Sequence, residues 1–581
     1  MERHLAPRRS LVDPHDPHLG NPRRREELDP AESERVVGLI GPATAREHYL
    51  DCMLPVRGKG LAEPGAGRVR VERALLSVDD KSGLADFARG LTDLGVELWA
   101  TRGTRQALEA AGVRARAAED LTGIGSWFGG RIKTLHPALL AGILSTASAE
   151  GEKELSERGF LRFDLVVVEL YPFEKHLTEH PAQSDHEEYI DIGGVTLARA
   201  AAKNHSRVAV VLDPRQYAPV LNELRAASGA LSAATRRNLA VEAFRRISAY
   251  DGAIARGISS AISQEDPFPP EVVFRRAPLR LRYGENPHQC SAVYTAVSPG
   301  AGLTGEPVEQ IKGDPLSFTN LLDLETARAT VAEFQTPSAT VVKHATPCGV
   351  ASGNTIGEAV EGAIVTDPVA RYGCAVAVNR RLGPADLTGF KGVFVDLLAA
   401  PDFELAAKEI LDKRPKIKLV RMTPRTLGPT RWEAHSALDY LLLQEVDQRQ
   451  LAPHEFRLVA GPPITGEMAS SLDFAWRVVR HTKSNAIVLA QGSETVGIGG
   501  GQPTRAKSVQ LACEIAGDRA KGAMLASDAF FPFADGVEIA GKAGVRAILQ
   551  PGGSMRDPEV IAMAERYHIS MLFTGWRVFR H

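Results

Sequence analysis

From Arg73 onward, short apolar runs alternate with longer stretches in which apolar residues recur at helical spacing. "ALLSV" is typical of a buried strand, and the apolar residues from Leu84 to Leu94 in "KSGLADFARGLTDLG" share one helical face. Ser82 is the predicted N-cap of that helix, and Gly95 its predicted C-terminal stop. This alternation predicts an α/β fold with a mostly parallel sheet covered by helices on both faces.

Further apolar runs extend the predicted sheet, namely "VELWAT", "FDLVVVEL" and "RVAVVL". In open α/β sheets, ligands bind beyond the carboxyl ends of the strands. The loops after Val78, Ala100 and Leu170 are therefore predicted to border a ligand site.

The length of 581 residues predicts more than one domain, since single hydrophobic cores stop growing near 250 to 300 residues. "SQEDPFPPEVV", residues 263–273, is the most proline-rich break in the chain. We therefore expect a poorly ordered extension over residues 1–72, a first α/β domain over 73–262, a linker over 263–275 and a second α/β domain over 276–581. The second domain is long enough for two subdomains, although no internal repeat is visible in its sequence.

Bulk composition excludes several classes of protein. A formal net charge of -2 argues against a nucleic-acid partner, and no apolar run is long enough for a secretory signal or a membrane span. The five cysteines are scattered and form no CxxC, which favours a reducing compartment over a disulfide framework. We expect a cytoplasmic protein with no membrane partner.

"VVKHATPCGVASG", residues 341–353, places Lys343, His344 and Cys348 close together. A deaminase-type zinc site needs an HxE motif and a PCxxC motif, and this segment lacks both the glutamate and the second cysteine, so we expect no metal. A proton-transfer pair fits better, because the ammonium of Lys343 would keep the imidazole of His344 neutral and able to accept a proton. The competing interpretation is a histidine that only hydrogen-bonds the backbone at a strand end.

"VGIGGGQPTR", residues 496–505, resembles a phosphate loop only weakly. It lacks the third glycine of GxGxxG and the Lys-Ser/Thr pair of a P-loop, and it follows a predicted hairpin. Its glycines would let a ligand approach the backbone closely, beside Gln502 and Arg505.

Two other glycine-rich segments carry charged residues, "GGRIKTLHP" (129–137) and "DIGGVTLARAAAKNH" (191–205). Glycine-rich turns that lead into helices expose backbone N–H groups to anions. Arg131, Lys133, Asp191 and Lys203 are thus candidates for balancing charge at a reacting carbonyl, and solvated surface charge is the alternative.

Ten segments occur in one order across residues 73–581: "LLSVDDKSGL", "GGRIKTLHPALLAGIL", "LYPF", "DIGGVTLARAAAKNH", "LRYGENPHQ", "VVKHATPCG", "KSNAIVLA", "GIGGGQ", "SDAFFPFADGVEIA" and "FTGWRVFRH". Together they closely resemble the bifunctional AICAR formyltransferase/IMP cyclohydrolase family of purine biosynthesis. The resemblance implies a methylglyoxal-synthase-like (Rossmann-like) first domain that closes the purine ring. It also implies a duplicated cytidine-deaminase-like second domain without zinc, which transfers a formyl group from the co-substrate 10-formyltetrahydrofolate, and a homodimer with formyltransferase sites built across the interface.

The resemblance assigns expected roles residue by residue. In the second domain His344 is the expected base for the substrate amine, and Lys343 is expected to stabilise the oxyanion or help protonate the leaving folate nitrogen. The expected substrate contacts there are Arg282, Tyr283, Asp396, Asn485, Gln502, Arg505, Phe530 and Arg577. The expected folate contacts are Tyr372, Pro532, Phe533 and Asp535.

In the first domain, ring closure depends mainly on holding a near-attack conformer, so few strong acids or bases are required. The expected reacting-end residues are Lys133, Tyr171, Asp191 and Lys203. The expected phosphate, ribose and backbone contacts are Ser77, Lys81, Thr101, Thr104, Arg131, Thr134, Gly193 and Gly194.

The chain departs from the family pattern at several of these motifs. Asp79 replaces the usual serine, Arg102-Gly103 replaces a glycine pair, and Glu169 replaces the usual asparagine before "LYPF". In the second domain "ARYGC" (370–374) replaces the usual "SAFGG", and Asp439-Tyr440 replaces a glycine pair. These departures motivate two alternatives: a divergent paralogue that acts on a related aminoazole carboxamide ribonucleotide with altered or lost cyclohydrolase activity, and an impaired, nucleotide-binding regulatory protein.

Overall fold

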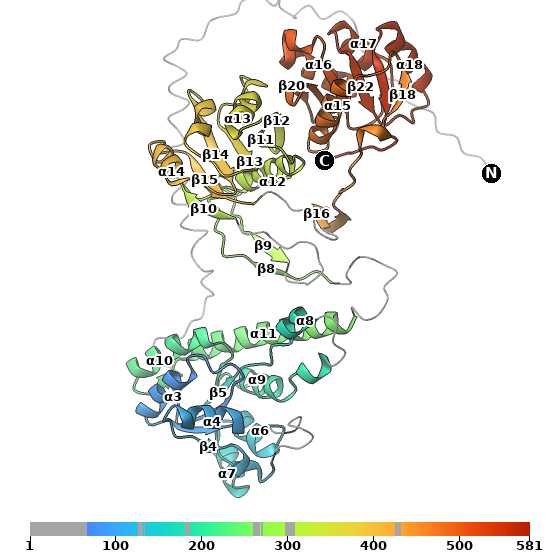
Figure 1. Ribbon diagram of the computed structural model, residues 1–581. Coiled ribbons are helices and arrows are strands. Elements are labelled where there is room, and N and C mark those ends of the chain that lie inside the picture. Colours follow the sequence, from blue (N-terminus) through green and yellow to red (C-terminus); the bar gives the residue numbers. More distant parts are fainter. Residues whose placement is uncertain are drawn as a thin grey trace, which may run out of the picture.

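A computed structural model describes residues 67–125, 132, 134–180, 186–259, 268, 271–296, 308–423 and 432–581. The described chain forms two α/β units, one within residues 67–259 and one within 271–581 (Figure 1). Nearly all of the expected N-terminal extension and most of the expected linker lie outside the described residues, as do Arg131 and Lys133. Within the described ranges, no helix is long and apolar enough to cross a membrane.

The first unit is built on a five-stranded, fully parallel sheet in the order β4-β3-β2-β5-β6. Its strands are β2 (Arg73–Ser77), β3 (Glu97–Ala100), β4 (Arg116–Ala117), β5 (Leu165–Val168) and β6 (Ala209–Val211). The interior strand β5 is buried along its whole length, which explains its continuous run of valines. The predicted parallel sheet is confirmed.

Helices surround this sheet, and the long α11 packs against α9, α8 and β6. The larger helices are α3 (Leu84–Asp93), α4 (Arg102–Ala110), α6 (Pro137–Leu144), α7 (Ala149–Glu157), α8 (Phe173–Glu179), α9 (Gly193–Lys203), α10 (Tyr217–Ala226) and α11 (Ala233–Ser259). Shorter elements are α5 (Glu119–Thr122), η2 (His186–Tyr189) and η3 (Pro214–Gln216). A two-stranded pairing of β1 (Val69–Arg70) with β7 (Ala230–Leu231) joins the expected extension to this unit a few residues before Arg73.

The start of α3 differs from the prediction. Its N-cap is Gly83 in the left-handed conformation, with no side-chain cap. The hydroxyl of Ser82 instead donates to Asp80 Oδ1 at 2.6 Å, so the predicted serine N-cap is wrong because an aspartate turn competes for the hydroxyl. Gly95 follows the helix at φ 80°, which confirms the predicted stop.

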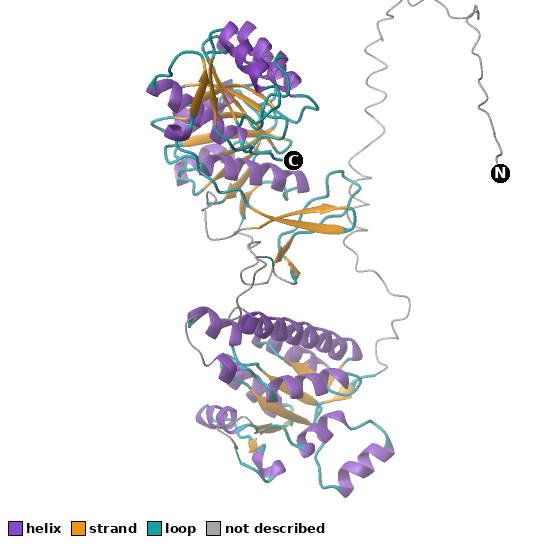
Figure 2. Cartoon of the chain, turned by 90° about the vertical axis from the view of Figure 1, so that its right-hand side faces the viewer, coloured by secondary structure: helices purple, strands orange, loops and turns teal. Residues whose placement is uncertain are grey.

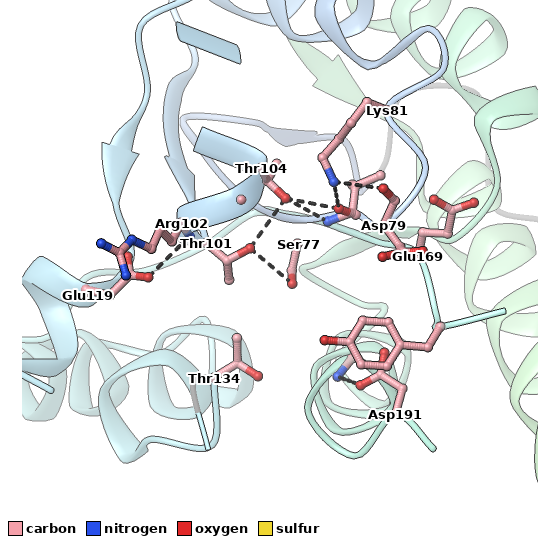
Figure 3. Close-up of a pocket in the computed structure, with 14 residues that line it drawn as sticks. Ser77, Asp79, Lys81, Thr101, Arg102, Thr104, Glu119, Thr134, Glu169 and Asp191 are labelled. Atoms are coloured by element: carbon pink, nitrogen blue, oxygen red, sulfur yellow. Dashed lines mark hydrogen bonds between the residues drawn. The ribbon is translucent and has the colours of Figure 1, made fainter. Parts of the chain in front are cut away.

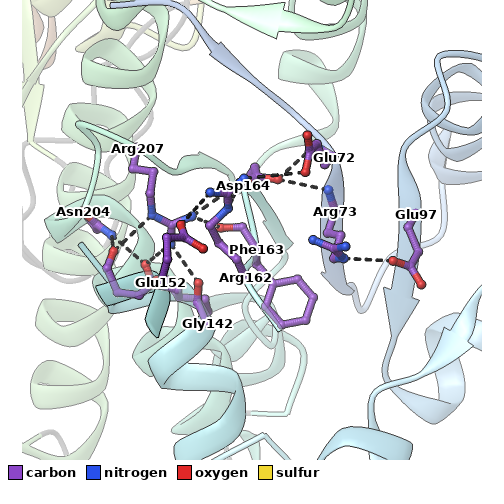
Figure 4. Close-up of polar contacts among 12 residues, drawn as sticks. Glu72, Arg73, Glu97, Gly142, Glu152, Arg162, Phe163, Asp164, Asn204 and Arg207 are labelled. Atoms are coloured by element: carbon purple, nitrogen blue, oxygen red, sulfur yellow. Dashed lines mark hydrogen bonds and ion pairs between the residues drawn. The ribbon is translucent and has the colours of Figure 1, made fainter. Parts of the chain in front are cut away.

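Arg207 and Asp164 form a buried polar cluster at the amino-terminal edge of this sheet (Figure 4). The Asp164 carboxylate accepts from the backbone N–H of Glu72 and Arg73 and pairs with the guanidinium of Arg207 at 3.4 Å. Arg207 also donates to four backbone carbonyls, those of Gly142, Ile143, Ser145 and Phe163. Asp164 also pairs with Arg162 at 3.2 Å, and this polar cluster holds the strand β2, the strand β5 and the end of α6 together.

We expect Asp164→Asn to lower the free energy of unfolding of the first unit by roughly 3 kcal/mol, because it leaves a buried guanidinium without its counter-charge. Urea unfolding followed by circular dichroism measures the change. Glu242→Gln is the matched control, since the exposed Arg245–Glu242 pair contributes under about 1 kcal/mol. Equal stabilities for the two variants would contradict the assignment.

The second unit is built on one continuous twelve-stranded sheet in the order β10-β15-β14-β13-β11-β12-β20-β19-β21-β22-β23-β18. The first six strands are β10 (Glu309–Lys312), β11 (Ser338–Lys343), β12 (Thr346–Ser352), β13 (Cys374–Val378), β14 (Val395–Ala400) and β15 (Lys418–Arg421). The other six are β18 (Arg457–Ala460), β19 (Ile487–Gln491), β20 (Glu494–Gly499), β21 (Met524–Ser527), β22 (Ala547–Gln550) and β23 (Ser570–Phe573). Outside this sheet lie two hairpins, β8 (Phe274–Arg276) with β9 (Tyr294–Ala296) and β16 (Trp432–Ala437) with β17 (Tyr440–Glu445).

Helices cover both faces of this sheet (Figure 2), which gives its strands apolar residues on both sides. One face carries α12 (Phe318–Ala332) and α15 (Gly466–Val479). The other carries α13 (Ile356–Val365), α14 (Leu405–Asp412), α16 (Arg505–Ala516), α17 (Asp535–Lys542) and α18 (Asp557–Arg566). Short turns of helix are η4 (Ala385–Phe390), η5 (Pro453–Glu455) and η6 (Gly517–Ala520).

The two halves of the large sheet repeat the same arrangement, although the sequence shows no repeat by eye. The hairpin β11–β12 has a register shift between Val341 and Val342, and β19–β20 has one between Leu489 and Ala490. In each copy a glycine of the second strand touches the following helix so closely that a Cβ atom would clash. These glycines are Gly349 against α13 and Gly497 against α16. Because β12 and β20 pair antiparallel at the centre of the sheet, the turns of the two hairpins lie at opposite ends of these central strands.

The halves meet at a buried ionic cluster where α12 and α15 end. Glu333 accepts from His481 Nε2 at 2.9 Å and pairs with Arg480 at 3.6 Å. Burial alone would raise the pKa of Glu333, but the hydrogen bond from His481 and the charge of Arg480 outweigh it and lower the pKa to about 2. Burial lowers the pKa of His481, so the imidazole is a neutral donor.

This cluster predicts that the second unit loses stability in acid. Both groups have a lower pKa in the folded state than in the unfolded state, so each stabilises the fold at pH values above its unfolded pKa. This stabilisation is lost as the pH falls. The loss begins below about pH 6.5 for His481, and runs from about pH 4.5 toward pH 2 for Glu333. The Glu333 contribution is roughly 3 kcal/mol. We expect Glu333→Gln to lower the melting temperature at pH 7 and to flatten its decline between pH 4.5 and pH 3. A parental pH dependence in that variant would show that other groups dominate.

Three cysteines, Cys348, Cys374 and Cys513, are free thiols, and burial raises their pKa values, that of Cys374 to about 12. Cys290 is disulfide-bonded, which the scattered cysteines did not predict.

Candidate active sites

A cavity of about 290 Å³ opens at the carboxyl ends of the parallel strands of the first unit (Figure 3). It is lined by Ser77, Val78, Asp79, Lys81, Thr101, Arg102, Gly103, Thr104, Glu119, Thr134, Glu169, Tyr171, Asp191 and Gly194. The loops after Val78, Ala100 and Leu170 all contribute, as predicted. The cavity therefore lies where a doubly wound sheet binds its ligand.

Hydroxyl groups form one wall of this cavity. Thr104 Oγ1 accepts from Val78 N–H at 3.0 Å, and Thr101 Oγ1 lies 3.4 Å from both Ser77 Oγ and Thr104 Oγ1. Thr101 is also the N-cap residue of α4, so the amino-terminal end of that helix lies beside these hydroxyls, and its first N–H, that of Arg102, donates to Glu119. This combination suits an anion such as a phosphate group.

Asp191 stands on the opposite side, just before α9. Its Oδ1 accepts from Gly194 N–H at 2.7 Å, and its own N–H donates to the hydroxyl of Tyr250 at 2.9 Å. Burial raises the pKa of Tyr250 to about 12, so its hydroxyl remains protonated at neutral pH. A Cβ atom at Gly193 would lie 2.3 Å from Thr134 Oγ1, and one at Gly194 would lie 2.3 Å from Asp191 Oδ2. Both glycines are required for this close approach.

The three departures in this unit all line the cavity. Glu169 Oε2 accepts from Asp80 N–H at 2.5 Å, and burial, with the nearby charges of Asp80 and Asp79, raises the pKa of Glu169. The backbone N–H of Arg102 donates to Glu119 at 3.2 Å, and its exposed side chain lies beside Glu119, away from Asp79 (Figure 3). Arg102 therefore neither fills the cavity nor neutralises Asp79.

One expected residue of the first unit lies far from this cavity. Lys203 is in the last turn of α9, which places it about 15 Å along the helix from Gly193. It is exposed and does not line the cavity. Lys81 does line it, with Nζ donating to the Asp79 carbonyl at 2.8 Å.

In the second unit, the expected site residues lie along one edge of the large sheet. This edge is formed by strand ends, not by an edge strand. It carries the carboxyl ends of four strands, β11, β20, β21 and β23. It also carries the amino ends of five, β12, β13, β14, β15 and β19. Thr346, at the start of β12, lies beside Gly500. This contact brings the Lys-His turn next to the glycine-rich segment of residues 496–505. A single edge thus carries candidate residues from both repeats.

Lys343 is the last residue of β11, and His344 begins the tight turn between β11 and β12. His344 and Ala345 both have positive φ angles, 55° and 54°, as in a type I′ hairpin turn. For residues other than glycine this conformation costs about 1 kcal/mol or more each. His344 is exposed, and Lys343 Nζ donates to the carbonyl of Tyr372 at 2.6 Å. The imidazole is therefore open to a ligand.

Around this turn lies what we call the first cluster, comprising Arg282, Tyr283, Lys343, His344, Tyr372 and Asp396. Asp396 pairs with Lys418 at 2.6 Å and accepts from Asn320 Nδ2 at 3.1 Å. Arg282 and Tyr283 lie near the start of α12, the helix that carries Asn320, because the Phe318 N–H donates to the Tyr283 carbonyl. Asn320 was not predicted from the sequence, in which its only signal is an amide in the first turn of a helix.

The second cluster comprises Asn485, Gln502, Arg505, Phe530, Pro532, Phe533, Asp535 and Arg577. Asn485 connects two of its members, because Nδ2 donates to the Gln502 carbonyl and Oδ1 accepts from Arg505, both at 2.8 Å. Arg505 is buried in an ion pair with Asp528. Phe530 is exposed beyond β21, and Arg577 is tied to the same edge because Val578 N–H donates to the Asp528 carbonyl.

Tyr372 of the first cluster and Phe533 of the second lie far apart within one chain. Tyr372 precedes β13 and Phe533 follows β21, and five strand spacings separate these strands, or about 24 Å. The expected folate contacts are thus divided between the two ends of the edge. Among the described residues no group of three or more His, Cys, Asp or Glu could hold a metal ion.

These features define a class of protein: an enzyme of two α/β units, with a nucleotide-sized cavity in a parallel sheet and an exposed Lys-His turn in a duplicated unit. The family model described as "AICARFT/IMPCHase bienzyme" matches residues 201–515, and the model "MGS-like domain" matches residues 83–196. The chain belongs to the AICARFT/IMPCHase bienzyme family.

Curated relatives agree with this assignment. The "Bifunctional purine biosynthesis protein PurH" of Desulfitobacterium hafniense is 42% identical over 519 residues, covering 88% of this chain and 99% of the relative. The protein of the same name from Rhodopirellula baltica is 41% identical over 523 residues, with the same coverage. A solved structure titled "Crystal structure of ForH" is 34% identical and covers 32% of this chain and 99% of its own, with a TM-score of 0.30 that is too low to support an argument. Nothing in these comparisons favours an analogue substrate.

Proposed function

We propose that the second unit transfers the formyl group of 10-formyltetrahydrofolate to the 5-amino group of AICAR, and that the first unit closes formyl-AICAR to IMP. These are the last two steps of purine biosynthesis de novo, and we expect them to take place in the cytoplasm. The observation that carries the proposal is the exposed Lys343-His344 turn at a sheet edge where strands of both repeats end.

In the formyl transfer, the amine nitrogen of AICAR attacks the formyl carbon and loses a proton. The amine is conjugated with the imidazole carboxamide and is a poor nucleophile, so it needs a base in the transition state. His344 accepts that proton in our proposal. The carbon–nitrogen bond to the folate then breaks, and Lys343, anchored on the Tyr372 carbonyl, stabilises the oxyanion or supplies a proton to the leaving nitrogen.

In the ring closure, the carboxamide nitrogen attacks the formyl carbon of the same molecule, and water leaves. The hydroxyl wall of Ser77, Thr101 and Thr104 would hold the phosphate and ribose. Asp191 and Tyr171 would face the reacting end, with Asp191 oriented by Gly194 N–H. Most of the acceleration comes from fixing the near-attack geometry.

We also propose a homodimer in which each formyltransferase site takes the first cluster from one chain and the second cluster from its partner. The separation of about 24 Å between Tyr372 and Phe533 supports this arrangement, since a second copy can bring the two together. The hairpin β16–β17 also supports an interface, because Leu438 is 93% exposed and Tyr440 is 70% exposed.

A paired assay tests the proposed function. Purified protein with AICAR and 10-formyltetrahydrofolate should release tetrahydrofolate, and the same protein with formyl-AICAR alone should form IMP. Analogue aminoazole ribonucleotides serve as competing substrates. No turnover of AICAR, or faster turnover of an analogue, would refute the proposal.

A further inference from the structure

The carboxylate of Asp323 lies directly behind the Lys-His turn. Asp323 is half-buried in α12, and its Oδ1 accepts from the backbone N–H of Ala345 at 2.7 Å. One helical turn further on, Thr326 Oγ1 donates to the Ala345 carbonyl at 3.3 Å. Two side chains of one helix therefore hold both polar groups of the residue that follows His344.

The turn needs such support because its backbone is strained. His344 and Ala345 both adopt left-handed conformations that side chains disfavour. In the second repeat, the position equivalent to His344 is Gly492, which adopts the same conformation without a side-chain penalty. The repeat that carries the imidazole thus keeps a histidine where its copy has a glycine.

We propose that Asp323 is a positioning residue for formyl transfer, whose carboxylate holds the His344-Ala345 turn so that the imidazole faces the substrate edge. This inference rests on the proposed function of the second unit. Asp323 acts through the backbone of the turn and does not touch the reacting atoms.

Charge gives Asp323 a second effect on the same histidine. Burial raises the pKa of Asp323, while the N–H of Ala345 and the nearby His344 and Lys343 favour its ionised form. The charged groups that interact with Asp323 are His344, Lys343 from β11 and Asp396 from β14, and Asp396 in turn pairs with Lys418 from β15. Asp323→Asn removes a negative charge from beside the turn, so the acidic limb of the pH profile for formyl transfer should move to lower pH.

Two substitutions separate these effects. Asp323→Ala removes the acceptor, and we expect kcat for formyl transfer to fall at least tenfold while the KM values change less than threefold. Asp323→Asn keeps an acceptor of the same shape, and we expect near-parental kcat at high pH with the acidic limb of kcat/KM moved at least half a pH unit lower. Glu325→Gln is the matched control, since it removes a carboxylate from the same helix, where Glu325 pairs with Arg328, and should behave as the parent.

Ring closure of formyl-AICAR and the melting transition of the second unit check that each variant is folded. Parental kcat and a parental pH profile in both Asp323 variants would overturn the inference. An inactive parent would instead refute the proposed function, so the two failures are distinguishable.

Discussion

His344→Ala is expected to slow formyl transfer about a thousandfold, because positioned acid–base groups contribute about a hundredfold to ten-thousandfold to rate. Ring closure of formyl-AICAR should be unchanged, since that cavity lies in the other unit. Release of tetrahydrofolate and formation of IMP, each from its own substrate, measure the two activities separately. Lys343→Ala should give a comparable defect through loss of the charge anchored on the Tyr372 carbonyl.

The control for this pair is His454→Ala, which removes an exposed histidine of the same unit in η5 and should leave both activities at the parental level. A parental rate of formyl transfer in the His344 variant would remove the imidazole from the mechanism. Loss of both activities would point to damage of the fold.

Two inactive variants are expected to restore each other when mixed. Phe530→Ala/Arg577→Ala alters only the second cluster, and His344→Ala alters only the first. If each site takes one cluster from either chain, a mixed dimer has one site with both defects and one site with none. Random exchange makes half of the dimers mixed, so about a quarter of the parental activity should return. Co-expression with two different affinity tags, followed by the formyl-transfer assay, measures this recovery.

The matched control mixes His344→Ala with Lys343→Ala. Both changes lie in the first cluster, so no combination yields an intact site and no recovery is expected. If the first pair also shows only the sum of its separate activities, each site is contained within one chain and the proposed interface is wrong.

The parallel sheet and the loops around the first cavity could be predicted because they depend on local patterns. Buried strands such as β5 are continuously apolar, and the loops after Val78, Ala100 and Leu170 follow from the rule that ligands bind at carboxyl ends. The remote position of Lys203 was also predictable, since ten residues of helix from Gly193 span about 15 Å.

Other features depend on tertiary contacts that no local pattern carries. Asn320 and Asp323 look like ordinary polar positions of an amphipathic helix, and only the packing of α12 beneath the β11–β12 turn gives them their partners. The repeat was invisible because its two copies share backbone geometry and a few glycine contacts rather than side chains. The failed Ser82 cap shows how a neighbouring aspartate can redirect a single hydroxyl.

The antiparallel join of β12 and β20 has a consequence for the ancestry of the second unit. If an ancestral half with one catalytic hairpin turn was duplicated, the product had two such turns, now the β11–β12 turn and the β19–β20 turn. These two turns point in opposite directions, and strand ends of both halves lie beside each of them. Gln491 still donates to the Lys521 carbonyl, as Lys343 does to that of Tyr372, so the β19–β20 turn preserves this contact of the β11–β12 turn. Neither half could be excised and remain active, because the surviving turn would lose the neighbours that the other copy supplies.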